Sequence, residues 1–279
     1  MTVSTVPEHI TTGAPHGRLG FRAVPAAGVG HVCFAAGLAG LGLLSLISGD
    51  FALAWQPVPA WVPWREGLAR ISGILLLTGG IGMWWERTAA RFALVMTAFL
   101  LSWLILLQVP RVAQAPRDVG MWLGFSETLV LVSGGWAIYA SLAGVRDWCS
   151  AWLASGARLA GILFGGSCLV LGVSHFVFTA ATVGMVPSWL PYRLGFAYLT
   201  GAGHLAAGTA ILLGIIPRLA ATLEACMISS FVLLVHVPGV TAAPSSRLQW
   251  TMLFVATALA GSAWAIAKSL QSTEWARQA

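Results

Sequence analysis

Three histidines in the second half of the chain are the residues best placed to do chemistry. His175, His204 and His236 lie inside long apolar segments or at their ends. Ionisable side chains are costly in such segments, so they are by default a functional hypothesis. Neutral imidazoles can ligate zinc, copper or haem iron, and a ring N–H can also hydrogen-bond to a quinone carbonyl. The alternative is a structural histidine paired with a backbone carbonyl or a neighbouring acid.

The three histidines are expected at two depths in a membrane. His175 and His236 should lie near the outer ends of their helices, at similar depth. His204 begins about nine residues into its span, which is roughly 14 Å at a rise of 1.5 Å per residue. Small residues around it, including Gly201 and Gly208, favour close helix packing and a hydrogen-bonded histidine, although they leave a ligand pocket open.

Two isolated acids and four dispersed cysteines complete the set of reactive groups. Glu224 is expected about one and a half turns into its helix, and Glu127 is a similarly isolated acid in an earlier one. The cysteines are far apart and form no Cys-x-x-Cys pair, which argues against a disulfide framework, a dithiol redox site and a structural zinc site. Those within apolar runs are expected to act as small hydrophobic residues. No residue is therefore assigned as a metal ligand.

The composition indicates that lipid surrounds these groups. The chain has 279 residues, of which 58% are hydrophobic and 9% are charged. A soluble domain carries about 25% charged residues, because its surface must meet water. The 15 basic residues are spread singly along the chain, which argues against a nucleic-acid partner in spite of the net charge of +6. The lipid bilayer is the expected partner.

Long apolar runs predict an all-α, polytopic membrane protein with about eight transmembrane helices. A membrane-spanning helix needs about 20 mainly apolar residues, and runs of that length without alternation are helices rather than strands. The second span is the weakest. The expected spans are 28–48, 67–85, 89–109, 119–141, 156–178, 195–215, 218–236 and 248–269.

A repeat divides the chain into two halves. The motif Trp61–Arg65 returns 128 positions later as Trp189–Arg193, and Val109-Pro110 returns at the same offset as Val237-Pro238. Recurrence of this kind is the mark of a duplicated unit. An even number of spans per unit predicts a parallel repeat, with a pseudo-two-fold axis along the membrane normal.

This repeat sets the predicted domains. We expect a cytoplasmic arm at 1–26, a first four-helix repeat at 27–145, a second at 156–270 and a tail at 271–279. Nine basic residues fall on the side of the termini and six on the other side, so both termini are predicted to be cytoplasmic in a bacterial inner membrane. The loops with the recurring motif then face outward, where their aromatic side chains could anchor the protein at the headgroups or border a ligand site.

Comparing the two halves shows where polar groups are gained. Matching the short motifs pairs Asp50 with His175, Gln108 with His236 and Leu76 with His204. The same matching pairs Ala93 with Glu224, so the second half has three additional histidines and one additional glutamate.

The second half resembles the DoxX-like family of small four-helix membrane proteins. The resemblance rests on Ser174-His175-Phe176, Trp189-Leu190-Pro191, Tyr198–Gly201 and Arg218–Ala221, within about 157–240. It implies a four-helix bundle per copy, here as a tandem duplication. It also implies a connection with quinone-linked sulfur oxidation or redox-partner complexes, which is known for some relatives. The doubling and the lack of paired cysteines depart from the family and its thiol-oxidising neighbours.

These observations favour a quinone-linked redox subunit, with a partner supplying the electron carrier because the chain has no flavin or nucleotide fingerprint. The sequence does not identify a cofactor; quinone is one candidate, and haem or a metal is the weaker alternative. A non-enzymatic lipid-binding or transport protein, and a structural subunit of a larger membrane complex, stay open, as does whether the chain is an enzyme. The expected ligand-binding residues are His175, Tyr192, Arg193, His204 and His236, with Asp50, Arg65 and Gln108 in the first half.

Overall fold

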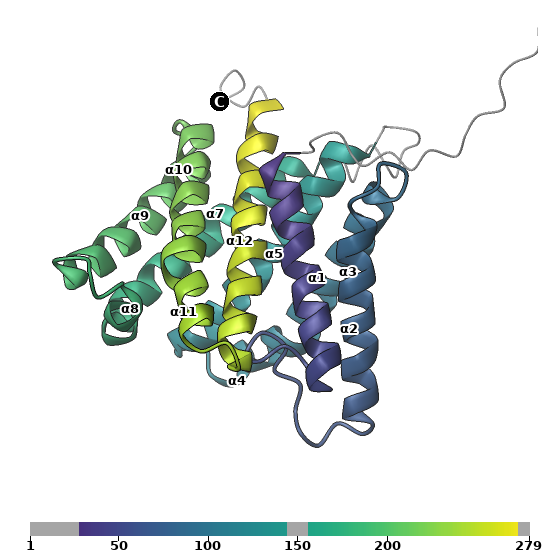
Figure 1. Cartoon of the computed structure of the whole chain (residues 1–279). Helices are drawn as coiled ribbons and strands as arrows, with labels where there is room; N and C mark the ends of the chain where they lie inside the picture. Colours follow the sequence, from purple (N-terminus) through teal and green to yellow (C-terminus); the bar gives the residue numbers. More distant parts are fainter. Residues whose placement is uncertain (1–27, 144–155, 273–279) are drawn as a thin grey trace, which may run out of the picture.

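The chain is all-helical across the residues that the structure describes. The computed structural model describes residues 28–143 and 156–272, and no strand occurs within them (Figure 1). The predicted cytoplasmic arm at 1–26 and all but the start of the predicted tail lie outside the described residues.

Seven helices of the described parts are long and apolar enough to cross a membrane, so the chain is a multi-pass membrane protein. A further long helix, α2 (Arg65–Gly82), is not among the seven. Its first two turns carry three charged residues. It corresponds to the span that the sequence marks as weakest. The seven are α1 (Val29–Ser48), α3–η1–α4 (Ala89–Gln114), α5 (Val119–Leu142), α7 (Ala157–Val177), α9 (Arg193–Leu213), α10–η2–α11 (Pro217–Ala242) and α12 (Arg247–Ser272).

Two of these helices continue through a proline where the sequence predicts an end. The π-helical turns η1 (Leu104–Gln108) and η2 (Val232–His236) precede Pro110 and Pro238, and the helices run on as α4 (Val109–Gln114) and α11 (Val237–Ala242). A proline inside a helix crowds the preceding turn and removes a donor. The wider π turn accommodates this local irregularity, and such turns are frequent at functional sites.

The loops with the recurring motif lie at one end of the helices. Loops 49–64, 115–118, 186–192 and 243–246 are at the end opposite the start of α1 and the finish of α12 (Figure 1). We call this the motif end, and the other the terminal end. The short helix α8 (Thr179–Met185) also lies at the motif end.

The two halves of the chain share one core. Helix α1 packs between α2 and α12, and α7 packs between α5 and α9, while α5 and α12 contact each other directly. Figure 1 shows α1 beside α12, although they are the first and last described helices of the chain. Because α1 makes only marginal contact with α5, the first half does not close into a four-helix bundle by itself.

Glycines permit the closest helix contacts. A Cβ atom on Gly261 of α12 would lie 2.2 Å from Phe34 N and 2.7 Å from Gly30 O of α1. A Cβ on Gly42 of α1 would lie 2.6 Å from Gly73 O, and one on Gly172 of α7 would lie 2.8 Å from Gly201 O. Small residues at such points let two backbones approach, which is how helices associate in lipid.

Candidate functional site

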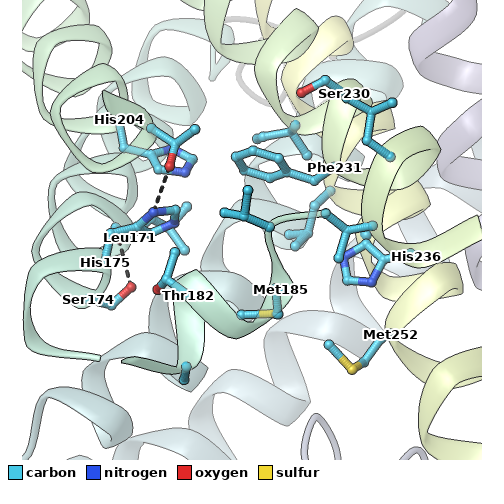
Figure 2. A pocket seen from close by; sticks show the side chains of 18 of the residues that line it. Leu171, Ser174, His175, Thr182, Met185, His204, Ser230, Phe231, His236 and Met252 are labelled. Atoms are coloured by element: carbon cyan, nitrogen blue, oxygen red, sulfur yellow. Dashed lines mark hydrogen bonds between the residues drawn. The ribbon is translucent and has the colours of Figure 1, made fainter. Parts of the chain in front are cut away.

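A cavity of about 560 Å³ lies mainly among the helices of the second half, with one wall from the first half. Its walls come from α5, α7, α8, α9, α10, η2 and α12, together with the loop after α8 and Trp55. Apolar and aromatic side chains such as Leu171, Phe231 and Met252 dominate the lining (Figure 2). This volume and character are typical of pockets that bind small molecules.

One wall of the cavity carries two histidines. His175 is in the last turn of α7 and His204 is in the middle of α9, and their rings meet edge to face with centroids 5.0 Å apart. The Thr200 hydroxyl lies 3.0 Å from His175 Nδ1, which fixes that ring. Both rings also face Phe231, at centroid distances of 6.2 and 6.0 Å.

A buried acid lies next to His204. Glu224 Oε1 of α10 is 2.6 Å from His204 Nδ1, and the two side chains are 0% and 4% exposed. The Cys168 thiol donates to the same oxygen, with Sγ 3.6 Å away. Glu224 Oε2 has no hydrogen-bond partner in the described parts of the chain. His204 is therefore linked through Glu224 to Cys168 of α7.

The opposite wall carries a third histidine. His236 ends the π turn η2, and Figure 2 shows its ring across the cavity from His175 and His204. Its Nδ1 atom is buried without a hydrogen-bond partner among the residues described. Glu127 of α5 also lines the cavity. The cavity thus has polar groups on two facing sides and apolar walls between them.

Tyr192 and Arg193, two predicted ligand-binding residues of the recurring motif, lie outside this cavity. Tyr192 is 86% exposed and precedes α9 with a φ of 53°. The Arg193 guanidinium donates to Val183 O at 2.6 Å and Val186 O at 3.0 Å. It therefore satisfies carbonyl groups at the end of α8, a capping role that basic side chains often take. Tyr192 and Arg193 therefore do not line this cavity.

The predicted residues of the first half also lie outside the cavity. Asp50 forms ion pairs with Arg65 and Arg247, and Arg247 also donates to Phe51 O. Gln108 is fully buried, where its Oε1 accepts from Arg111 at 3.2 Å. The contacts of Arg65 and Arg247 join loop 49–64 to the starts of α2 and α12, and Asp50, Arg65 and Gln108 do not line the cavity.

The ion pairs of Asp50 with Arg65 and Arg247 make the stability of the folded protein depend on pH. Burial by itself raises the pKa of the Asp50 carboxyl, but hydrogen bonds from the Phe51 N–H, Arg65 and Arg247 outweigh it and hold this pKa below the usual value. A carboxyl with a lowered folded-state pKa stabilises the fold above its unfolded-state value of about 4 and loses this effect as pH falls through the folded pKa. We expect the melting temperature in detergent to fall below about pH 4, and Asp50→Asn to lower it at pH 7 and weaken its dependence on acid.

The matched control is the exposed pair Glu66–Arg70, whose side chains are 66% and 62% exposed. Such pairs contribute little, so Glu66→Gln should leave both the melting temperature and its pH profile unchanged. Equal profiles for the wild type and Asp50→Asn would contradict the assignment.

Helix register corrects two of the internal pairings. Helices α3 and α10 begin at Ala89 and Pro217, 128 positions apart, and the π turns keep this offset. Glu224 therefore corresponds to Met96 rather than to Ala93.

On α1 and α7, Gly42 and Gly172 make the equivalent close contacts, and they are 130 positions apart. His175 then corresponds to Ser45 rather than to Asp50. The earlier matching failed because it followed short identical motifs across loops of different length.

Sequence reasoning missed the link between His204, Glu224 and Cys168. It treated Cys168 as a small hydrophobic residue and Glu224 as an isolated acid. The usable signal was helical register, because the offset of 128 places Glu224 at a fully buried position of its helix. Within the described residues, no group of three or more His, Cys, Asp or Glu side chains has the arrangement of a metal site.

Comparison with known proteins gives one family. Residues 164–267 match the model of a family described as a domain of unknown function, DUF8561. No curated protein and no solved structure matches the chain. The matched segment runs from α7 into α12 and includes most of the residues that line the cavity.

Proposed function

We propose that this chain is a quinone-linked redox subunit whose cavity binds a small, planar, largely apolar molecule of the quinone class. The observation that carries the proposal is the cavity itself, in which histidines lie on two facing sides of an apolar space. A quinone has an apolar ring with a carbonyl oxygen at each end, so it can accept hydrogen bonds at both sides while its ring fills the space between.

Ordinary lipid fits this lining less well. An acyl chain would fill the apolar walls but would leave His204 Nε2 and His236 Nδ1 without partners. Leaving buried polar groups unpaired costs about 1–3 kcal/mol each. A ligand with hydrogen-bonding atoms at two ends removes this cost, which favours a quinone over a lipid-handling role.

Matching local structures in the two halves support a tandem duplication of a DoxX-like four-helix unit, with eight helices in all. Trp64 and Tyr192, 128 positions apart, both precede a helix with left-handed backbone. The Trp122 indole donates to Pro116 O at 2.9 Å, and the Trp250 indole donates to Pro244 O at 2.8 Å. The family match within the second half, at 164–267, is also consistent with a separate unit.

The two units differ where the polar groups lie. The positions that correspond to Cys168, His204 and Glu224 hold buried Leu38, Leu76 and Met96. We therefore assign a single ligand site, in the second half. With cytoplasmic termini in a bacterial inner membrane, this site would open toward the outer leaflet, and a partner would supply the electron carrier.

The test combines quinone extraction with direct binding. The protein is purified in mild detergent, its extracted lipids are analysed for quinone, and binding of 1,4-naphthoquinone is followed by quenching of tryptophan fluorescence. Trp55 and Trp189 line the cavity and should report occupancy. His236→Ala should weaken binding about tenfold, as expected for one lost hydrogen bond.

Tyr192→Ala is the control, because Tyr192 is exposed and lies outside the cavity. It should bind naphthoquinone as the wild type does. A wild-type protein that carries only phospholipid and binds no added quinone would contradict the proposal and favour lipid binding or transport.

A further inference from the structure

The His204–Glu224 pair is enclosed near the middle of the membrane-spanning helices. His204 lies eleven residues after Arg193, the first residue of α9, and nine before its last residue, Leu213. These separations are about 16 and 14 Å along the helix axis. The carboxyl of Glu224 is fully buried there.

This position requires the pair to be electrically neutral. An isolated negative charge in an apolar interior is very costly, whereas a paired one is tolerated. In the described part of the chain, the only ion-pair partner of Glu224 is His204. The other titratable groups at the pair are both on α7, namely the thiol of Cys168 against Oε1 and the ring of His175 against His204.

Neutrality fixes the state of the other ring nitrogen. If the shared proton is on Nδ1, the pair is an imidazolium and a carboxylate. If it is on Glu224, the pair is a neutral imidazole and a carboxylic acid. In both forms Nε2 carries a hydrogen. A third neutral form, with the acid proton on Oε2 and Nδ1–H donating to Oε1, has a bare Nε2, but it is disfavoured because the buried Oε2 has no hydrogen-bond partner among the described residues. His204 Nε2 is therefore a donor wherever the shared proton lies.

Nε2 is also the ring nitrogen left for the cavity. His204 lines the cavity, and its Nδ1 is engaged by Glu224. The rings of His175 and Phe231 pack edge-on against the His204 ring, at 5.0 and 6.0 Å between centroids, and hold its orientation (Figure 2).

Packing alone does not account for the pair. At the corresponding positions of the first half, Leu76 and Met96 are 0% and 1% exposed, so this arrangement of helices accommodates two apolar residues there. Polar groups that serve the fold normally have all their hydrogen bonds satisfied, but Glu224 Oε2 has no partner among the described residues.

We propose, on the basis of the quinone site above, that His204 donates a hydrogen bond from Nε2 to one carbonyl oxygen of the bound quinone. Glu224 is the positioning residue, because it fixes the ring through Nδ1 and keeps Nε2 protonated. His236, on the facing wall, serves the other carbonyl. The two ends of a symmetric quinone thus become unequal, with the stronger donor at His204.

Infrared spectroscopy of bound 1,4-naphthoquinone, labelled with ¹³C at its carbonyls, tests this directly. In the wild type we expect two carbonyl bands, the lower one from the oxygen bonded to His204. In His204→Leu/Glu224→Met, which copies the first half, the lower band should return to the frequency of a carbonyl without a strong donor. Binding should weaken about tenfold, as for one lost hydrogen bond.

Three further variants separate the contributions. Glu224→Gln should reduce the shift of the lower band, because an amide cannot hold the imidazolium form. His236→Ala should leave the lower band in place and move only the other. Tyr192→Ala, at an exposed residue outside the cavity lining, should leave both bands unchanged.

The possible failures are distinguishable. If the double variant binds naphthoquinone and retains the lower band, the assignment of His204 is overturned while the quinone site stands. If the wild type binds no naphthoquinone, the quinone site and this inference both fail.

Discussion

Gly261→Ala should strongly destabilise the protein, because the new methyl group would collide with backbone atoms of α1. The Cβ would lie 2.2 Å from Phe34 N, and backbone cannot move away as a flexible side chain can. Overpacking typically costs about 1–3 kcal/mol, and a collision with backbone belongs at the upper end of that range or above it. The expected readout is a large drop in melting temperature in detergent, or loss of monodisperse protein.

Gly166→Ala is the matched control for this prediction. Gly166 also lies inside a long helix, α7, but a Cβ there would meet nothing within 4 Å. Alanine is favoured over glycine in a helix by about 1 kcal/mol, so this variant should melt at or above the wild-type temperature. Equal destabilisation of both variants would show that the contact between α1 and α12 is not close.

His204→Leu alone should be among the most destabilising changes in the second half. It leaves the fully buried Glu224 without its only ion-pair partner among the described residues. Breaking a buried pair from one side costs roughly 3–5 kcal/mol, whereas replacing both partners with apolar residues is often neutral. We therefore expect Glu224→Met to restore the melting temperature when it is added to His204→Leu.

The decisive quantity is the coupling free energy between His204→Leu and Glu224→Met. A double-mutant cycle measured from thermal unfolding in detergent should show strong non-additivity, because each single change removes the same interaction. Additive losses would mean that Glu224 does not depend on His204. The reverse change in the first half, Met96→Glu, should also be destabilising, because Leu76 offers it no partner.

The sequence indicated the membrane class and singled out three histidines for a clear physical reason. Length and apolarity decide whether a segment can span a membrane, and both are properties of the segment itself. The same cost argument identified His175, His204 and His236, which the structure brings to one cavity. Isolated polar residues in apolar helices are conspicuous without any knowledge of packing.

The residues of the recurring motif have structural roles in the fold. Trp64 and Tyr192 occupy left-handed backbone just before a helix, and Arg193 serves carbonyl groups of α8. A turn that the fold needs once in each half recurs in the sequence just as a binding motif would. Single-sequence comparison cannot separate the two, since the difference lies in which carbonyl groups need donors after folding.

The packing of α1 against α12 also sets the order in which the protein can be completed during synthesis. Helix α1 is the first described helix to leave the ribosome, and α12 is the last. Until α12 enters the bilayer, the glycine face of α1 at Gly30 and Gly37 has only lipid or a temporary partner to cover it. The first half therefore cannot mature before the second is made, and premature termination within α12 should leave the entire chain unassembled rather than a finished half.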